Sequence, residues 1–502
     1  MYKSVRKNNA TDCIVKLCCA ISFVFQLLCD LISFSFDYAA NFALFLNVYI
    51  LFAVIIAYFF VNGINKHFLA FSFFVCFFIF LLGQKFFVVL QGGSYDRFLT
   101  FSALTLRVKE YFSFVNLLYF SLLSCFAGYV LFKPRFCKER KTGSAKKNEL
   151  KNMRKLLRVL YVITFVCAFV MQWTIFKAKK DLSYTDSYLV NVDVNTVIKI
   201  GNYLFTGIAF LYLASAPKKK EMLWILFSFL FVKGFIQLFT GRRALLAQVL
   251  LFIVWYFVCY FKYDKKKFTL KHFALLFVFA LLLIVLFYAV EALRGGHGVG
   301  GVSLLKMIEK FFTFTGGSDS TIANIIRHKS EFPRRGVVYL FNPLYEALFD
   351  NVLTRKIIAV ITGTDAGSVA QGLEYLNRHD SFSHWLSYIV NPELYLNGYG
   401  MGSSYISEVY FAFGTVGFVI FGLILGACIR RCNNLRYVNG VYAKAFVMLF
   451  VYNVFVLPRG GVFSAATELL YLLAAMVLVK ILCFIIYPAK HYSYGGKYER
   501  VP

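Results

Sequence analysis

The sequence is poor in acidic residues and in charged residues as a whole. Asp and Glu together number 25 against 54 Lys and Arg, and charged residues make up 16% of the 502 positions, whereas hydrophobic residues make up 60%. The mean hydropathy is +0.66, and apolar runs of about 20 residues, long enough to cross a bilayer, recur along the chain. This composition excludes a soluble globular fold and predicts an all-α polytopic membrane protein.

Several motifs of soluble enzymes are also missing. The sequence has no Walker loop, HExxH zinc helix, paired CxxC motif or GxSxG elbow in a suitable context. The segment GYGMGS at 398–403 has the spacing of a Gly-rich nucleotide loop, but no strand is expected before it. We therefore expect neither a nucleotide donor nor a metal, and no cofactor.

Cysteine is present at twelve positions, but none lies between 291 and 404, and most fall within apolar runs. Such cysteines behave as small apolar side chains that fill gaps between helices, and they do not predict a disulfide framework.

The apolar runs predict about 12 membrane spans. We expect them near residues 13–36, 40–61, 67–90, 111–132, 156–176, 199–215, 222–240, 243–261, 271–291, 404–429, 442–457 and 462–487. With the basic N-terminus inside, the strongly basic connections all fall on the cytoplasmic side, as the positive-inside rule requires. The net charge of +29 is thus explained by topology, and no nucleic-acid partner is expected.

This register divides the chain into four parts. Residues 1–290 hold about nine spans, 291–403 form a large external loop, 404–490 hold about three spans, and 491–502 form a cytoplasmic tail. A loop of that length is usually structured and functional. Its apolar stretches near 304–315 and 336–361 are expected to form interfacial or re-entrant helices over the membrane domain.

The stretch 398–431 places polar groups at one end of a membrane helix. At helical spacing, one face carries Ser404, Glu408, Phe411 and Thr415. A carboxylate so near a bilayer must face protein or water, which makes Glu408 a candidate functional residue. The alternative is a capped helix start, with Ser404 as N-cap and Glu408 favoured in the early turn.

Four arginines fall on the outer side of this topology: Arg242, Arg243, Arg294 and Arg459. Their position opposes the positive-inside bias, and the guanidinium fork suits bidentate binding of phosphate oxygens. Each taken alone is equally explained as an interfacial residue or an ion-pair partner, for example Arg294 with Glu291. As a set, the four arginines favour an anion site.

The loop and one span add further polar candidates. In the loop these are Asp319, Arg327, His379 and His384. A neutral His384 imidazole beside a sugar hydroxyl would accept its proton near neutral pH, although a structural histidine is the alternative. Lys233 and Gln237 lie one turn apart below Arg242 and extend the basic surface inward, unless Lys233 merely snorkels.

Three segments carry a resemblance to a known family. GYGMGSSYISEVYFAFGTVGF, FSHWLSYIVNPELYLNG and LPRGG resemble the O-antigen polysaccharide polymerase family, Wzy, over about residues 290–480. That family looks related to the O-antigen ligases, which carry a histidine at the head of the helix that follows the long loop. This chain has Ser403 and Ser404 there, which favours a polymerase and leaves the general base open.

The resemblance implies a membrane-embedded, GT-C-like glycosyltransferase that is inverting and metal-independent. Such an enzyme transfers a growing glycan from undecaprenyl pyrophosphate to the non-reducing sugar of a new lipid-linked repeat unit, on the periplasmic face of the bacterial inner membrane. The implied partners are the bilayer and the undecaprenyl-pyrophosphate-linked oligosaccharide, with a chain-length regulator as a candidate.

Site roles follow from this implied reaction. The leaving group is a pyrophosphate, so clustered guanidiniums would stabilise the charge that develops on it. The pyrophosphate-binding candidates are Arg242, Arg243, Arg294 and Arg459. Glu408 is the candidate base, with His384 as the alternative. The substrate-binding candidates are Ser403, Ser404, Tyr405 and Asp319.

Two other functions compete with a polymerase. A ligase-type glycan transferase would use a similar site. A flippase for the same lipid-linked repeat unit would also have about a dozen helices, but it is expected to show internal repeats and charge near mid-membrane, which the sequence does not clearly have.

Overall fold

A computed structural model of the chain describes residues 2–33, 39–92, 97, 99–101, 104–132, 144–180, 182, 190, 192–240, 242–260, 278, 281–290, 302–351, 354–355, 360–361 and 371–487. Among them, ten helices are long and apolar enough to cross a bilayer, and two shorter apolar helices lie at Leu281–Val290 and Val441–Val454. Each of the twelve coincides with one predicted span. The all-α polytopic membrane fold is therefore confirmed.

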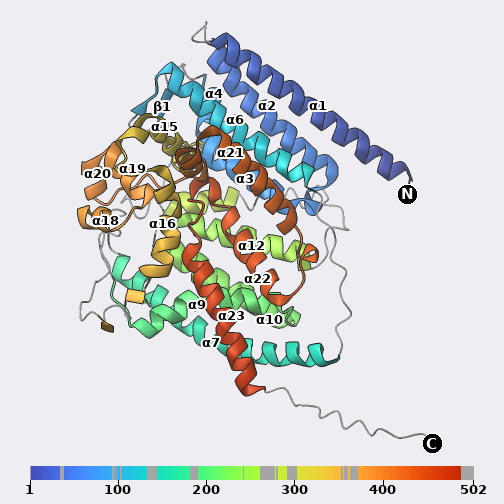
Figure 1. The fold of residues 1–502 in the computed structure, drawn as a ribbon, viewed down its shortest axis with the longest axis vertical. Coiled ribbons are helices and arrows are strands. Elements are labelled where there is room, and N and C mark those ends of the chain that lie inside the picture. The colour runs from blue at the N-terminus through green and yellow to red at the C-terminus, as the bar shows by residue number, and fades with distance from the viewer. Residues whose placement is uncertain are drawn as a thin grey trace, which may run out of the picture.

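The ten long spans and α22 are, in chain order (Figure 1), α1 (Tyr2–Ser33), α2 (Ala39–Asn62), α3 to α4 (Phe68–Leu90), α6 (Val108–Leu131), α7 (Ser144–Lys179), α9 (Thr196–Ala214), α10 to α11 (Lys219–Phe239), α12 (Arg243–Tyr260), α21 (Tyr405–Cys432), α22 (Val441–Val454) and α23 (Ala466–Ile486). Helix α7 begins well before the expected residue 156, because its polar first turns are rich in good helix formers.

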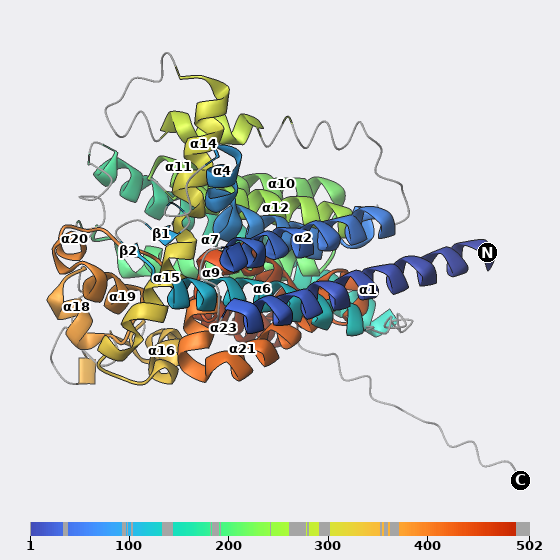
Figure 2. The same ribbon diagram turned by 90° about the horizontal axis from the view of Figure 1, so that it is seen from above.

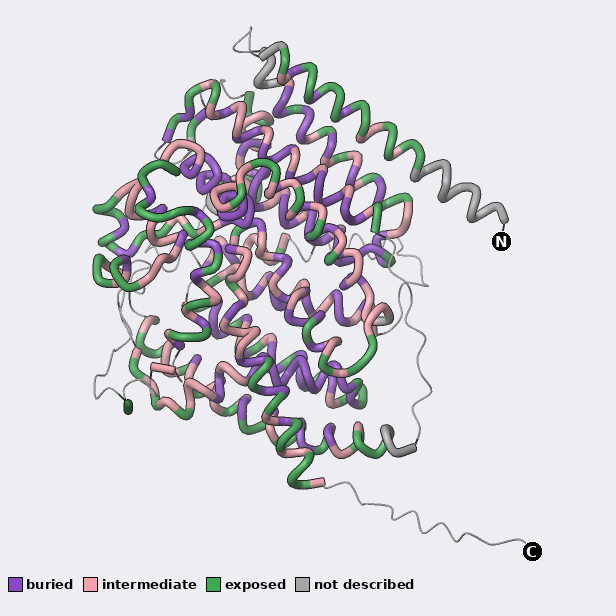
Figure 3. The backbone as a smooth tube through the Cα atoms, in the orientation of Figure 1, coloured by how far each residue is buried: buried purple, intermediate pink, exposed green. Residues whose placement is uncertain are grey.

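The helices differ in how far they are enclosed by protein. In α1, 17% of the apolar window is buried, against 67% in α6, and Figure 3 shows α1 exposed along most of its described length. Helix α1 therefore lies at the periphery and α6 in the interior of the bundle.

Close helix contact through glycine fixes α21 against α6. A Cβ on Gly426 would lie 2.7 Å from the backbone nitrogen of Tyr129, and one on Gly128 would lie 2.8 Å from the Cα of Leu423. Small residues let the two backbones approach this closely, as at many membrane-helix interfaces. The later part of α21 is therefore held closely against α6.

Helix α21 is not continuous. Gly414 adopts φ +65° and ψ −165°, a conformation open to glycine, and separates the first nine residues from the rest of the helix. The helix face predicted from Ser404 to Thr415 is interrupted there, and Thr415 is exposed. Residues 405–413 therefore form a short helical segment of their own before the break.

Two spans contain a π-helical turn. These are η2 (Phe78–Leu82), between α3 (Phe68–Phe77) and α4 (Gly83–Leu90), and η3 (Leu230–Phe235), between α10 (Lys219–Phe229) and α11 (Ile236–Phe239). Such turns often occur at functional sites. Gly83 follows η2 and packs so closely on Phe312 of the loop that a Cβ would lie 3.0 Å from its ring.

The long loop is largely helical where it is described. Its helices are α14 (Leu304–Thr315), α15 (Asp319–His328), α16 (Gly336–Phe349), α18 (Leu373–Arg378), α19 (Phe382–Val390) and α20 (Pro392–Leu396). Figures 1 and 2 both show α15, α16 and α18 to α20 gathered at one end of the bundle, with the N-terminus at the opposite end. A two-stranded antiparallel pair, β1 (Thr100–Phe101) and β2 (Leu104–Thr105), lies at the same end.

Two contacts join the loop helices to the membrane helices. Arg327 of α15 forms an ion pair with Glu110 of α6, its Nε lying 3.1 Å from Oε2. Gly336, at the start of α16, lies against the α21 backbone, where a Cβ would be 2.8 Å from the nitrogen of Ala412. The loop therefore packs directly on the first segment of α21.

Candidate functional site

Glu408 connects two turns that lie more than fifty residues apart in the sequence. Its Oε1 accepts a hydrogen bond from the Ser403 hydroxyl at 2.6 Å, and its Oε2 accepts one from the backbone N–H of Val462 at 2.8 Å. The Glu408 side chain is buried, as expected for a carboxylate at this depth. It therefore holds the Gly-rich turn before α21 against the turn that follows Arg459.

The capping interpretation of Ser404 is also confirmed. Ser404 is the N-cap of α21, its Oγ accepts from the Ile406 N–H at 3.4 Å, and its carbonyl accepts from the Glu408 N–H at 3.1 Å. Ser404 is fully buried. Its side chain is thus used in starting the helix, while that of Ser403 faces Glu408.

Tyr405 anchors the same helix. Its hydroxyl is hydrogen-bonded to the hydroxyl of Ser121 on α6, and its ring is buried. This residue was predicted to bind substrate; the contacts that the structure gives it are with α6.

Arg459 lies in the 3₁₀ turn η8 (Leu457–Arg459) and is exposed. It lines a cavity of about 340 Å³, which we call the Arg459 cavity. The other lining residues combine hydroxyl, amide and aromatic groups, and they include Gln84, Ser318, Ser320, Ser387, Asn391, Tyr395, Tyr399, Gly400 and Met401. Hydroxyl and amide groups beside aromatic rings are suited to binding sugars, and the guanidinium is suited to an anion.

His384 reaches this cavity through another residue. Its Nδ1 lies 3.0 Å from the hydroxyl of Tyr395, which lines the cavity, and its ring lies tilted against that of Tyr375 with 4.2 Å between the centroids. Burial lowers the pKa of His384 to about 4. The imidazole is therefore neutral at pH 7, and its Nδ1 shares a hydrogen bond with the Tyr395 hydroxyl.

Asp319 stands behind the cavity wall. It is fully buried at the start of α15, and its neighbours Ser318 and Ser320 line the Arg459 cavity. Burial raises the pKa of Asp319 to about 7, and the Lys85 ammonium opposes the shift. Lys85 in turn donates to the carbonyl of Thr100 at 2.6 Å. Asp319 borders the wall of the site without lining it.

Arg242 lines a second cavity, of about 470 Å³, which we call the Arg242 cavity. Three elements bring further charged side chains into it: Lys179 from α7, Lys233 from η3 and Glu468 from the start of α23. Gln237 also lines it, as its spacing from Lys233 predicted, and its carbonyl accepts from the Arg242 N–H at 3.1 Å. Two lysines and an arginine against one carboxylate give the lining an excess of cationic side chains, which suits an anion.

The predicted arginines therefore do not all meet. Arg242 and Arg459 line different cavities, Arg243 begins α12 in a half-buried position, and Arg294 lies outside the described residues. By contrast, His384 contacts Tyr395 in the lining of the Arg459 cavity, and Asp319 adjoins Ser318 and Ser320 there. Ser403 and Glu408 lie outside this lining and are joined to the turn that follows Arg459.

Sequence reasoning missed two residues that help to form these cavities. Glu468 is a carboxylate at the start of an apolar span, and that position alone marks it as a candidate. Tyr395 has no such signal in the sequence, because its place in the site depends on its hydrogen bond to His384, which belongs to another helix of the loop.

The loop candidate His379 lies 3.4 Å from Glu346 and 3.3 Å from Asp350, and it lines neither cavity. No three His, Cys, Asp or Glu side chains in the described parts of the chain are placed to share a metal ion.

Comparison with known proteins identifies one family. The model of the family described as O-antigen polysaccharide polymerase Wzy matches residues 18–491, which is nearly the whole chain. No curated protein and no solved structure matches this chain.

Proposed function

Since this chain belongs to the O-antigen polysaccharide polymerase Wzy family, and so is a membrane polymerase for O-antigen, we propose how it carries out that polymerisation. The growing glycan passes from undecaprenyl pyrophosphate to the non-reducing sugar of an incoming lipid-linked repeat unit. The end of the bundle that carries α15 to α20 faces the periplasm, and the protein lies in the bacterial inner membrane.

The observation that carries this proposal is the position of Glu408. Its carboxylate joins Ser403 to the turn after Arg459, so a proton acceptor and an anion-binding guanidinium lie on one connected structure. Polymerisation from a pyrophosphate donor needs both: a base for the acceptor hydroxyl and a cation for the leaving group.

The step is an inverting displacement. The acceptor hydroxyl attacks the anomeric carbon of the donor, the bond from that carbon to the pyrophosphate oxygen breaks, and the pyrophosphate leaves with the bonding electrons. The hydroxyl proton passes to Ser403 Oγ while the Ser403 proton moves to Glu408 Oε1, 2.6 Å away. Arg459 stabilises the charge on the departing pyrophosphate.

His384 is the alternative base. In that route the acceptor proton passes to the Tyr395 hydroxyl, which lines the Arg459 cavity, while the Tyr395 proton moves to Nδ1 of His384. The two routes differ in the residue whose loss stops the reaction.

Two separate cation-lined cavities suit a reaction with two lipid-linked substrates. The acceptor reacts at its far sugar, so its own pyrophosphate lies several sugar rings from the reacting hydroxyl. The Arg242 cavity, with Lys233 and Lys179, would hold that second pyrophosphate while the Arg459 cavity holds the donor. A single shared anion site would not serve both substrates at once.

The placement of charge favours this enzyme over a flippase. Glu468 is the third residue of α23, and Lys233 is the fifteenth of the 21 residues of the span Lys219–Phe239. Glu468 therefore lies at a helix end and Lys233 lies between the centre and the end of its span, whereas a transporter would be expected to carry its site at mid-membrane. The proposal also includes a division of the chain into residues 1–290, 291–403 and 404–490. It further includes a contact with a chain-length regulator.

The test is reconstitution of the purified protein in liposomes with purified lipid-linked repeat units and no other protein. Elongation of the glycan on its lipid supports the proposal. Movement of repeat units across the bilayer without elongation would instead identify a transporter.

A further inference from the structure

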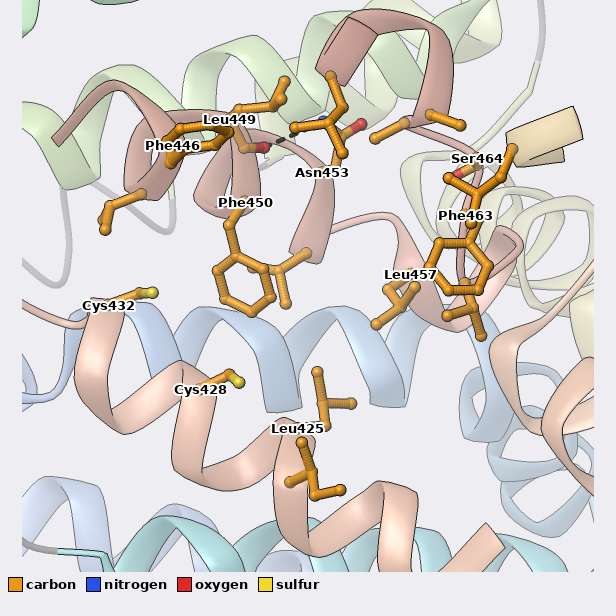
Figure 4. A pocket seen from close by; sticks show the side chains of 18 of the residues that line it. Leu425, Cys428, Cys432, Phe446, Leu449, Phe450, Asn453, Leu457, Phe463 and Ser464 are labelled. Carbon is orange, nitrogen blue, oxygen red and sulfur yellow. Dashed lines mark hydrogen bonds between the residues drawn. The ribbon is translucent and has the colours of Figure 1, made fainter. Parts of the chain in front are cut away.

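An apolar cavity of about 490 Å³ lies between α21, α22 and the residues that follow η8. Figure 4 shows Leu425 and Cys428 of α21 on one side, Phe446 and Phe450 of α22 facing them, and Leu457 between Phe450 and Phe463. The volume is within the range of about 300–1,000 Å³ that is usual for ligand pockets. An apolar lining of this kind is suited to a hydrocarbon and not to water.

The polar atoms in the lining are largely occupied. Asn453 donates to the Leu449 carbonyl at 3.0 Å, and its Oδ1 accepts from Gln248 at 3.4 Å. The cavity therefore offers little recognition of a polar group, and its ligand is recognised by shape and apolar contact.

The cavity follows α21 and reaches the outer surface of the bundle. On α21 its lining runs from Phe421 to Cys432, a stretch of about 16 Å at about 1.5 Å per residue. Ile424, also in the lining, is 56% exposed. A long chain that lies in the bilayer can thus enter from the side and run along the helix.

One end of this apolar cavity adjoins the candidate site. Leu457, Val462 and Phe463 line the apolar cavity, Arg459 in the same turn lines the Arg459 cavity, and the Val462 N–H is bonded to Glu408. A molecule with a hydrocarbon tail and an anionic head would therefore place its tail in one cavity and its head beside Arg459.

We propose that this cavity binds the isoprenoid tail of the donor polyprenyl diphosphate, with the diphosphate held at Arg459. The proposal rests on the proposed function for the identity of the lipid. It adds the place where the tail binds and the direction in which the substrate lies across the turn of residues 457–463. The charge of Arg459 next to the apolar slot favours this occupant over a hydrocarbon without a charged head.

The test uses photolabelling, which does not require turnover. A polyprenyl diphosphate with a photoreactive group in its tail is added to the full-length protein in nanodiscs. The sample is irradiated, and the labelled peptides are identified by mass spectrometry. We expect labelling of residues 421–432 and 446–454, and loss of it when unlabelled polyprenyl diphosphate, but not excess phosphatidylglycerol, is added.

A pair of variants on the same helix gives the control. Cys428→Trp fills the cavity and is expected to reduce this labelling to the level without light, whereas Ile420→Trp, on an exposed position outside the lining, leaves it unchanged. Elongation is measured on the same preparations. If the wild-type protein elongates the glycan but these peptides carry no label, the tail site alone is overturned. If these peptides are labelled but the glycan is not elongated, the result counts against the proposed function alone.

Two other outcomes also overturn the proposal. Equal competition by phosphatidylglycerol would make the cavity a gap filled by ordinary lipid. Cross-linking of Cys428 to Cys428 between two chains by a bifunctional thiol reagent, without photolabelling, would assign it to a second copy of this chain.

Discussion

Gly461 lies directly against the carboxylate of Glu408. A Cβ on residue 461 would stand 2.9 Å from Oε2 and closer still to Oε1. The absence of a side chain at 461 is therefore what lets the turn after Arg459 close over the carboxylate and donate the Val462 N–H to it.

Gly461→Ala is expected to displace Glu408 and to reduce both stability and activity. Overpacking at a buried contact costs about 1–3 kcal/mol, and the displaced carboxylate loses its bond from Val462. Thermal unfolding and elongation are the measurements. Gly372→Ala is the matched control, because a Cβ there meets open space. Equal behaviour of the two variants would show that the contact at 461 has no consequence.

Ser403 and Ser404 form a natural pair for a second prediction. Ser404→Ala removes the N-cap of α21 and should cost about 0.5–2 kcal/mol of stability while leaving the turnover number near that of the wild type. Ser403→Ala removes one of the two hydrogen bonds to the buried Glu408 carboxylate and should also cost about 1–3 kcal/mol, but it should lower the turnover number far more than Ser404→Ala, because the proton path to Glu408 is broken. If both variants lose activity in proportion to stability, Ser403 has only a structural role.

The two arginine cavities predict independent effects. Arg242→Lys and Arg459→Lys each keep the charge but lose the bidentate fork, so each should raise KM for the lipid-linked substrate. Because the residues line different cavities, the free-energy effects should add within about 0.5 kcal/mol in the double variant. A larger interaction energy would indicate that both arginines bind one pyrophosphate.

The lowered pKa of His384 predicts a pH-dependent stability of the loop. Its pKa is about 4 in the folded protein against 6.5 for an ordinary histidine, so the unfolded state binds more protons between these values. Stability contributed by neutral His384 is present above about pH 6.5 and is lost as the pH falls toward 4. Hydrogen exchange of residues 371–403 should rise at pH 5, and less so in His384→Gln. An identical rise in both proteins would contradict this.

Much of the fold follows from the sequence because membrane spans are set by local composition. The twelve apolar runs, the start of α14 at Leu304 and the capped start of α21 depend on residues close together in the chain. The break at Gly414 could not be read from the pattern, since one glycine in an apolar helix is usually tolerated.

The site was harder to predict because it depends on long-range contacts. The position of Glu408 at a helix start makes it a candidate residue, but its bond to Val462 joins segments that no periodicity relates. Likewise, four outer arginines suggested one anion site, whereas the packing of η3, α7 and α23 gives Arg242 a cavity of its own.

The central claim is that Glu408 accepts a proton during the chemical step at the Arg459 cavity. It is tested most directly by single-turnover elongation with purified lipid-linked repeat units, comparing wild type, Glu408→Gln and His384→Ala, with substrate binding and thermal unfolding measured on the same samples.

Glu408→Gln keeps the size of the side chain and removes the proton acceptor, so the chemical step should slow by roughly 10²- to 10⁴-fold while the lipid-linked substrate still binds. His384→Ala should retain most of the wild-type rate. Elongation that survives Glu408→Gln and is abolished by His384→Ala would contradict the account and assign the base to His384.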